Sequence, residues 1–261
     1  MPITIDLAGQ VALVTGGTKG IGAGIADRLA DAGATVVVCG RNAPADGGRR
    51  SDVQSTATAH EFHACDVRDP DKVVALVEAI VGAHGRLDIA VNNAGGAPSV
   101  DAADASPRFS EAVIRLNLLA PMQVAQAANR VMQQQQGGGA IVNITSVSAL
   151  RPSPGSSAYG AAKAGLLSLT RSVAIEWAPK VRVNAVSGGL IATEDSLDHY
   201  GGADGLARVA ATVPLGRFGM PADVADAVVF LASPLASYVT GANLVLHGGG
   251  EWPAFLRAAE G

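Results

Sequence analysis

Cysteine is scarce in this chain: among its 261 residues only Cys39 and Cys65 are cysteines. Each stands at the end of an apolar segment, and the two lack the spacing of a metal-ligand pair. So few cysteines exclude a disulfide-stapled scaffold, and we expect no metal in the functional site. Both thiols are expected to be buried and reduced, as is usual in a cytoplasmic protein.

Long apolar runs and an excess of positive charge are also missing. No run approaches the ~20 residues of a membrane span. The stretch from Met1 to Gly9 has no basic segment followed by an apolar core, as a signal peptide would have. The formal net charge is -4, which provides no basic footprint for nucleic acid. We therefore expect a cytoplasmic protein that binds neither membrane nor nucleic acid.

Apolar residues and glycine are abundant by contrast. Hydrophobic residues make up 48% of the chain and 32 residues are glycine, whereas aromatic residues make up only 4%. This composition suits tight turns and closely packed layers of helix on sheet. The length and the absence of a linker or solenoid repeat predict one large domain over residues 1–261.

Short buried apolar runs alternate with segments of helical spacing along the chain. This alternation predicts an α/β protein: a doubly wound parallel sheet (Rossmann fold) of about seven strands with helices on both faces. We expect strands at 10–15, 34–39, 61–64, 87–91, 140–146, 181–186 and 243–246, and helices from the first glycine-rich turn to about 32 and at 69–83, 109–136 and 156–177.

The first expected strand runs into a glycine-rich turn, Gly16-Gly17-Thr18-Lys19-Gly20-Ile21-Gly22, that opens a helix. This order suits a pyrophosphate, because glycines let the backbone approach and a helix N-terminus supplies N–H donors and a positive dipole. The spacing G-x-x-x-G-x-G differs from the usual G-x-G-x-x-G. A turn that merely joins strand to helix is the alternative, but its context favours a dinucleotide-binding domain.

The end of the second expected strand bears on which dinucleotide binds. An acidic residue there would hold the ribose 2′-hydroxyl of NAD, and an arginine would accommodate the 2′-phosphate of NADP. This chain has Arg41 and no carboxylate there, and Lys19 in the turn adds a second positive charge. Two solvated surface cations are the alternative. We expect NADP(H) to be preferred, with NAD(H) as the other candidate.

Tyr159 and Lys163 share one face of an expected helix, because residues at i and i+4 are neighbours there. A free tyrosine has a pKa of about 10, and a nearby ammonium favours the phenolate and lowers that pKa. Ser146 ends an apolar strand, where its hydroxyl could hydrogen-bond a substrate oxygen. These three side chains make a sensible set for general acid–base chemistry.

The bland alternative is that each feature is ordinary on its own. A tyrosine and a lysine four residues apart occur in many helices, where the tyrosine is half buried and the lysine solvated. Serine often finishes a strand or starts a turn. The catalytic interpretation therefore depends on the combination of these residues with the glycine-rich turn.

The combined motifs closely resemble those of the short-chain dehydrogenase/reductase family in its single-domain classical form. The resemblance covers roughly residues 8 to 250. Several motifs in the family's order are more specific than any one alone. The matching elements are Thr15-Gly16-x-x-x-Gly20-Ile21-Gly22, Asn92-Asn93-Ala94-Gly95, Asn117, Ser146 and Tyr159-x-x-x-Lys163.

This resemblance implies a role for each matching residue. Tyr159 would be the general acid in carbonyl reduction and the base in alcohol oxidation, Lys163 would lower its pKa and hold the nicotinamide ribose, and Ser146 would orient the carbonyl oxygen. Asn117 would support a water relay to the lysine, with a capping or packing amide as the alternative. The implied cofactor-binding residues are Gly16, Thr18, Lys19, Gly20, Ile21, Gly22, Arg41, Asp66, Val67, Asn93, Ala94, Gly95, Tyr159, Lys163, Gly189, Ile191 and Thr193.

The chain departs from the family pattern after the sixth strand, where Gly188 replaces the usual proline. Glycine has wider backbone freedom, so we expect a looser segment there. Residues 190–214 resemble the family's variable substrate lid, in which His199 and Tyr200 are candidate substrate contacts. The tail carries Trp252 and Phe255, which could pack between subunits of a homotetramer or homodimer, as in related proteins.

The leading functional prediction is an NADP(H)-dependent oxidoreductase that interconverts a secondary alcohol and a ketone in a small-molecule substrate. Within enzymes, a 3-oxoacyl thioester reductase and an NAD-dependent alcohol or polyol dehydrogenase compete with it. A dinucleotide-binding sensor or scaffold is the non-enzymatic alternative. An incomplete catalytic set would favour the sensor, yet all four catalytic positions are filled.

Overall fold

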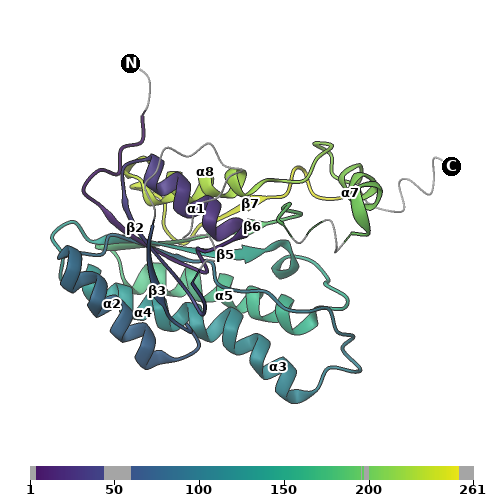
Figure 1. Ribbon diagram of the computed structural model, residues 1–261, viewed down its shortest axis with the longest axis horizontal. Coiled ribbons are helices and arrows are strands. Elements are labelled where there is room, and N and C mark those ends of the chain that lie inside the picture. The colour runs from purple at the N-terminus through teal and green to yellow at the C-terminus, as the bar shows by residue number, and fades with distance from the viewer. Residues whose placement is uncertain (1–3, 44–59, 195, 197–199, 253–261) are drawn as a thin grey trace.

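The computed structural model describes residues 4–43, 60–194, 196 and 200–252. Within these residues one sheet of seven parallel strands has the order β3-β2-β1-β4-β5-β6-β7 (Figure 1). The predicted parallel α/β sheet is confirmed. The strands are β1 (Val11–Thr15), β2 (Thr35–Gly40), β3 (Glu61–Ala64), β4 (Ile89–Asn92), β5 (Gly139–Ser146), β6 (Val181–Gly188) and β7 (Asn243–Leu246).

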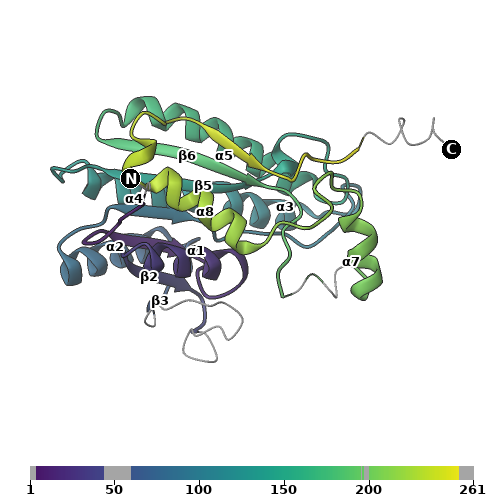
Figure 2. The same ribbon diagram turned by 90° about the horizontal axis from the view of Figure 1, so that it is seen from above.

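Helices cover both faces of the sheet. Helices α1 and α8 lie on one face, and α2, α4 and α5 lie on the other (Figure 1 and Figure 2). The helix α7 stands apart from both layers, beyond the carboxyl ends of the strands. Their bounds are α1 (Gly20–Asp31), α2 (Pro70–His84), α3 (Pro107–Ile114), α4 (Ala120–Met132), α5 (Ser157–Glu176), α7 (Gly202–Ala210) and α8 (Pro221–Ala232).

The two layers enclose separate cores because successive side chains of a strand point to opposite faces. In β1, Leu13 belongs to the cluster beneath α2 and α4, whereas the next residue, Val14, belongs to the cluster that contains residues of α1 and α8. All five residues of β1 and all four of β4 are buried. The strand order changes direction between β1 and β4, so the crevice at their carboxyl ends is the expected ligand position.

The helix predicted over 109–136 is wrong in one respect: it is divided. The α-helical segment α3 ends at Ile114, a π-helical turn spans Arg115–Leu119, and α4 then begins. Pro121 has no N–H to donate to the carbonyl of Asn117, four residues earlier, so regular α-helical bonding cannot continue through this point. Such single π turns are frequent at functional sites, and Asn117 lies inside this one.

None of the helices that the structure describes combines the length and apolar content needed to cross a bilayer.

Arg182 in β6 closes the end of α8. Its guanidinium donates hydrogen bonds to the carbonyl oxygens of Leu231 (2.7 Å), Ala232 (3.2 Å) and Ser233 (3.3 Å). The last carbonyls of a helix have no partner within the helix, so this side chain satisfies groups that would otherwise be left unpaired. The price is partial burial of the charge, which lowers the pKa of Arg182.

Replacing Arg182 with methionine should therefore destabilise the protein. We expect Arg182→Met to reduce the free energy of unfolding by about 1.5–3 kcal/mol, because charge-assisted hydrogen bonds to buried carbonyls are lost. Arg171→Met is the matched control, since Arg171 lies on an exposed position of α5. Urea unfolding followed by circular dichroism would measure both variants, and equal stabilities would contradict the capping role.

Candidate active site

The glycine-rich turn lies between β1 and α1, as predicted. Gly16 adopts a positive φ of 64°, which favours glycine. A Cβ at Gly22 would collide with the carbonyl oxygen of Gly16, and a Cβ at Gly17 would lie 2.6 Å from Val38 Cγ1. Side chains are therefore excluded from the inner surface of the turn. The N-terminus of α1 opens at Gly20, so its N–H groups face the space that a pyrophosphate needs.

Two residues brace this turn against the end of β4. The hydroxyl oxygen of Thr15 accepts hydrogen bonds from the backbone N–H groups of Asn93 and Ala94, both at 3.0 Å. The amide Nδ2 of Asn93 donates to the carbonyl oxygens of Thr15 (3.0 Å) and Gly16 (3.1 Å). The predicted cofactor residues Asn93 and Ala94 thus lie beside the glycine-rich turn, and Thr15 positions them.

A carboxylate already lies at the N-terminus of α1. The backbone N–H of Gly20 donates to Oε1 of Glu194 at 3.4 Å. Glu194 follows Thr193, whose side-chain methyl would lie 3.6 Å from a Cβ at Gly20. The sequence does not predict this contact, because Glu194 lies 174 residues from Gly20 and leaves no local signal.

The three predicted cofactor residues after β6 form its continuation. The N–H of Gly189 donates to the carbonyl of Leu246 at 2.8 Å, and Ile191 forms an isolated parallel bridge with Gly219. The N–H of Thr193 donates to the hydroxyl of Ser196 at 2.8 Å. The strand β6 ends at Gly188, which pairs with Ser146 of the neighbouring strand β5.

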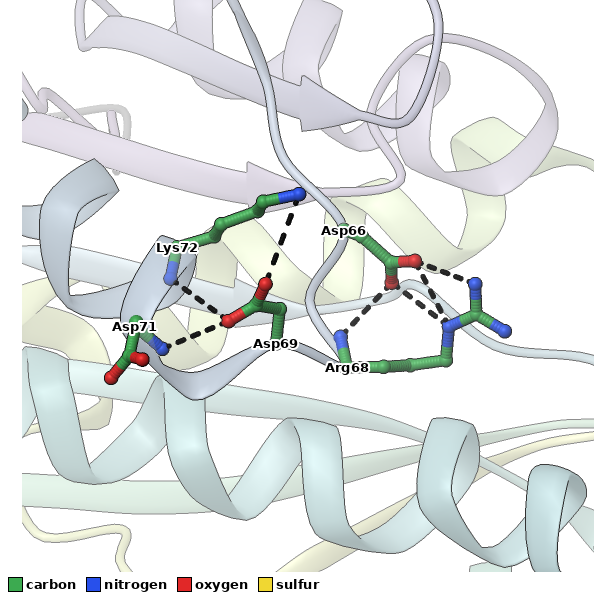
Figure 3. Close-up of polar contacts among 5 residues, drawn as sticks. All are labelled: Asp66, Arg68, Asp69, Asp71 and Lys72. Carbon is green, nitrogen blue, oxygen red and sulfur yellow. Dashed lines mark hydrogen bonds and ion pairs between the residues drawn. The ribbon is translucent and has the colours of Figure 1, made fainter.

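The remaining predicted cofactor-binding residues lie at the start of α1 and after β2 and β3. Lys19 is exposed at the N-cap of α1, and Ile21 lies in its first turn. The side chain of Thr18 lies against Gly40, because a Cβ there would be 3.5 Å from its Cγ2. Arg41 directly follows β2, and Asp66 and Val67 come after Cys65, the first residue past β3. Arg68 was not predicted: it pairs with Asp66 (Figure 3).

Ser146, Tyr159 and Lys163 come together at the carboxyl end of β5. The hydroxyl of Ser146 lies close enough to Tyr159 to lower its pKa, and Lys163 Nζ lies 5.6 Å from the centre of the Tyr159 ring. Lys163 Nζ donates to the carbonyl oxygen of Ile144 at 2.8 Å. The lysine is only 3% exposed, so it is not the solvated cation of the bland alternative.

Burial has opposite effects on the two titratable groups of this set. It lowers the pKa of Lys163 to about 8, because the ammonium loses solvation. It raises the pKa of Tyr159, and the nearby Ser146 only partly opposes this rise. The prediction that Lys163 lowers the tyrosine pKa is therefore wrong for the protein chain by itself, since desolvation of the phenolate dominates.

Asn117 is fully buried and holds the loop after β4. Its Oδ1 accepts from the N–H of Gly96 at 2.8 Å, and its Nδ2 donates to the carbonyl oxygens of Gly96 and Val113, both at 2.9 Å. A Cβ at Gly95 would lie 2.8 Å from this Oδ1 and 3.2 Å from Lys163 Nζ. The π turn, the loop after β4 and the lysine therefore meet at one glycine.

Other predicted contacts are not all brought to this site. His199 and Phe255 lie outside the described residues. The ring of Tyr200 meets that of Phe218 edge to face at a centroid distance of 5.3 Å. Trp252 is 52% exposed. Beyond β5, β6 and β7 lies a cavity of about 340 Å³ lined by Val147, Leu150, Arg151, Gly189, Leu190, Val213, His247, Gly249, Gly250 and Glu251.

The doubly wound sheet and its braced glycine-rich turn define a dinucleotide-binding protein of the Rossmann class. A family model described as "Enoyl-(Acyl carrier protein) reductase" matches residues 16–251. With the curated relatives below, this match shows that the chain belongs to the short-chain dehydrogenase/reductase family. The protein is accordingly an oxidoreductase that acts on CH–OH groups with a nicotinamide dinucleotide.

Relatives with different substrates resemble the chain over nearly its whole length. The D-threitol dehydrogenase of Mycolicibacterium smegmatis is 37% identical, over 93% of this chain and 93% of its own. A 3-oxoacyl-[acyl-carrier-protein] reductase of Chlamydia muridarum is 38% identical, over 93% of this chain and 98% of its own. The structure of Thermoplasma acidophilum aldohexose dehydrogenase matches with a TM-score of 0.86 and 31% identity, covering 95% of this chain and 96% of that one.

Close packing around Gly95 can be tested without a substrate. We expect Gly95→Ala to reduce the free energy of unfolding by about 1–3 kcal/mol, because the new methyl group presses on Asn117 and Lys163. Gly82→Ala is the control: it lies in α2 with nothing within 4 Å of a new Cβ. There we expect a gain of about 0.5–1 kcal/mol. Denaturant titrations that rank the two variants equally would rule out the crowding.

Proposed function

We propose that the protein is an NADP(H)-dependent oxidoreductase that interconverts a secondary alcohol and a ketone, with Tyr159 as the general acid/base. The observation that carries this proposal is that Ser146, Tyr159 and the buried Lys163 lie together at the carboxyl end of β5. A phenol so placed can give a proton to a carbonyl oxygen or take one from an alcohol. The cradle without side chains between Gly16 and Gly22 fits the pyrophosphate of the cofactor.

The bound nicotinamide would supply or accept the hydride. In reduction, Tyr159 Oη donates its proton to the substrate oxygen as negative charge develops there, and Ser146 Oγ donates a hydrogen bond to the same oxygen. In oxidation the phenolate takes the hydroxyl proton. Lys163 would hold the ribose hydroxyls with its ammonium, and Asn117 keeps the loop carrying Gly96 in place. Together these residues make the set that sequence analysis named as catalytic.

The proposed preference for NADP(H) rests on charge. Lys19 stands at the N-cap of α1 and Arg41 directly follows β2, both are exposed, and no acidic residue follows β2 directly. Guanidinium and ammonium groups bind phosphate through charge-assisted hydrogen bonds. A carboxylate, by contrast, would repel the 2′-phosphate. These two residues therefore favour NADP(H) over NAD(H).

For the substrate we propose a small polyol or sugar, or the corresponding carbonyl compound. The D-threitol and aldohexose dehydrogenases support this class, since both act on polyhydroxy compounds by name. A 3-oxoacyl thioester is the second candidate, because the Chlamydia muridarum reductase is just as similar. Turnover of a polyol panel and of a 3-oxoacyl thioester would separate the two.

We also propose that the protein forms a homo-oligomer, a tetramer or a dimer. Two parts of its surface expose large apolar side chains. On the α4–α5 side these are Leu119, Met122 and Ile175, and on the α8–β7 side they are Phe230, Tyr238 and Leu244. Large apolar side chains left exposed near one another are typical of protein interfaces.

Removing the phenolic hydroxyl should abolish turnover while leaving cofactor binding in place. We expect Tyr159→Phe to reduce kcat by about 10²–10⁴-fold, the usual contribution of general acid–base catalysis. Tyr238→Phe is the matched control, since Tyr238 is fully exposed. Absorbance of the reduced nicotinamide would follow turnover on the substrate panel, and a Tyr159→Phe variant with normal kcat would refute the assignment.

The pH profiles of the two directions follow from the raised pKa of Tyr159. Reduction needs the protonated phenol, so its rate should not fall through ionisation of Tyr159 below about pH 10. Oxidation needs the phenolate, so its rate should still be rising at that pH. An oxidation rate that levels off near neutral pH would contradict this assignment.

The cofactor preference is tested by removing Arg41. We expect Arg41→Ala to weaken NADPH binding about tenfold or more, which corresponds to the loss of one charge-assisted hydrogen bond, and to leave NADH binding unchanged. Arg108→Ala, at an exposed position of α3, is the control. Fluorescence titration would give the dissociation constants, and tighter binding of NADH than of NADPH by the wild type would overturn the proposed preference.

A further inference from the structure

Arg68 and Asp66 form a two-pronged ion pair in the loop between β3 and α2 (Figure 3). Arg68 Nη2 lies 2.5 Å from Asp66 Oδ2, and Arg68 Nε lies 2.9 Å from Asp66 Oδ1. The backbone N–H of Arg68 also donates to Oδ1 at 3.1 Å. Three donors from one residue thus fix the plane of this carboxylate.

The ion pair between Arg68 and Asp66 contributes little to the stability of the loop. The side chains of Arg68 and Asp66 are 37% and 28% exposed, and ion pairs that reach solvent contribute about 0–1 kcal/mol to stability. The start of α2 depends instead on Asp69, whose Oδ1 accepts from the N–H groups of Asp71 and Lys72 (Figure 3). The carboxylate of Asp69 therefore caps α2, whereas that of Asp66 is held by Arg68 and does not cap the helix.

The position of Asp66 relative to the glycine-rich turn indicates what that carboxylate would meet. Tyr159 lies on the β5 side of β1, so the nicotinamide end of a dinucleotide bound at the turn lies on that side. The adenosine end must then extend over the carboxyl ends of β2 and β3. Asp66 comes two residues after the end of β3, and Arg41 at the end of β2 lies near enough to contribute to its low pKa. The side chain of Asp66 is ionised, since Arg68 above all holds its pKa at about 2.

Adenine offers one strong donor, its exocyclic amino group, and a carboxylate accepts hydrogen bonds only. We propose that Arg68 is a positioning residue that holds the Asp66 carboxylate in the orientation that accepts a hydrogen bond from the adenine amino group. This inference rests on the proposed dinucleotide binding. What it adds is the role of Arg68, which sets the orientation of the carboxylate without touching the base.

A cofactor analogue provides a direct test. Reduced nicotinamide hypoxanthine dinucleotide phosphate carries a carbonyl oxygen in place of the amino group. Fluorescence titration would give its dissociation constant and that of NADPH for the wild type, Arg68→Gln, Arg68→Lys and Asp66→Asn. We expect the wild type to prefer the adenine cofactor about tenfold, Arg68→Gln to lose most of this preference, and Arg68→Lys to retain part of it. Asp66→Asn should lose the preference.

Arg86→Gln is the matched control. Arg86 and Asp88 form a pair of the same sequence spacing, with Nε–Oδ2 at 2.7 Å and Nη2–Oδ1 at 2.8 Å, just before β4 at the opposite edge of the sheet. We expect this variant to keep the wild-type ratio of the two dissociation constants. Arg68→Gln would be expected to change the ratio, whereas a merely structural role would weaken both cofactors equally.

Each other outcome overturns a different claim. If the wild type binds both dinucleotides equally well, or if Arg68→Gln keeps the wild-type ratio, the positioning role is refuted and the proposed enzymatic function stands. If the wild type binds neither dinucleotide, the proposed function fails and the role of Arg68 fails with it.

Discussion

The enclosed amine of Lys163 is the constraint on which the Ser146 and Tyr159 side of the site depends. A charge taken out of water costs several kcal/mol unless partners compensate it. Here the carbonyl of Ile144 accepts from the amine at 2.8 Å, and the pKa of Lys163 falls to about 8 because the compensation is incomplete. The neighbouring elements must leave room for this group, which explains why a residue without a side chain, Gly95, lies between it and Asn117.

The parallel sheet makes this arrangement possible because all of its strands end at one edge. Thr15 at the end of β1, Asn93 after β4 and Ser146 at the end of β5 come from distant parts of the chain, yet they lie along that edge in strand order. The hydrogen bonds between Thr15 and Asn93 tie the glycine-rich turn to the loop that Asn117 holds. The two ends of the site are therefore linked through β4 rather than through a flexible hinge.

Features with a local cause could be predicted from the sequence, and features that depend on tertiary contacts could not. The apolar runs of the sequence predict the buried strands. Asp69 before Pro70 correctly predicts the start of α2. The helical spacing of apolar residues continues through the π turn at Asn117. Pro121 is the one residue in this stretch that indicates a break in the α-helix. Glu194 at the N-terminus of α1 has no sequence signal, because the contact joins residues far apart in the chain.

The direction of the pKa shift of Tyr159 cannot be inferred from the identity of its neighbours alone. A lysine one helical turn away suggests a phenolate stabilised by an ammonium, but that ammonium is committed to the Ile144 carbonyl and is itself poorly solvated. Burial therefore dominates and keeps the tyrosine protonated. For the proposed reaction, a protonated phenol beside Ser146 is ready to give a proton to a carbonyl oxygen, whereas alcohol oxidation must first remove that proton. The protein chain by itself is thus better prepared at neutral pH for reduction than for oxidation.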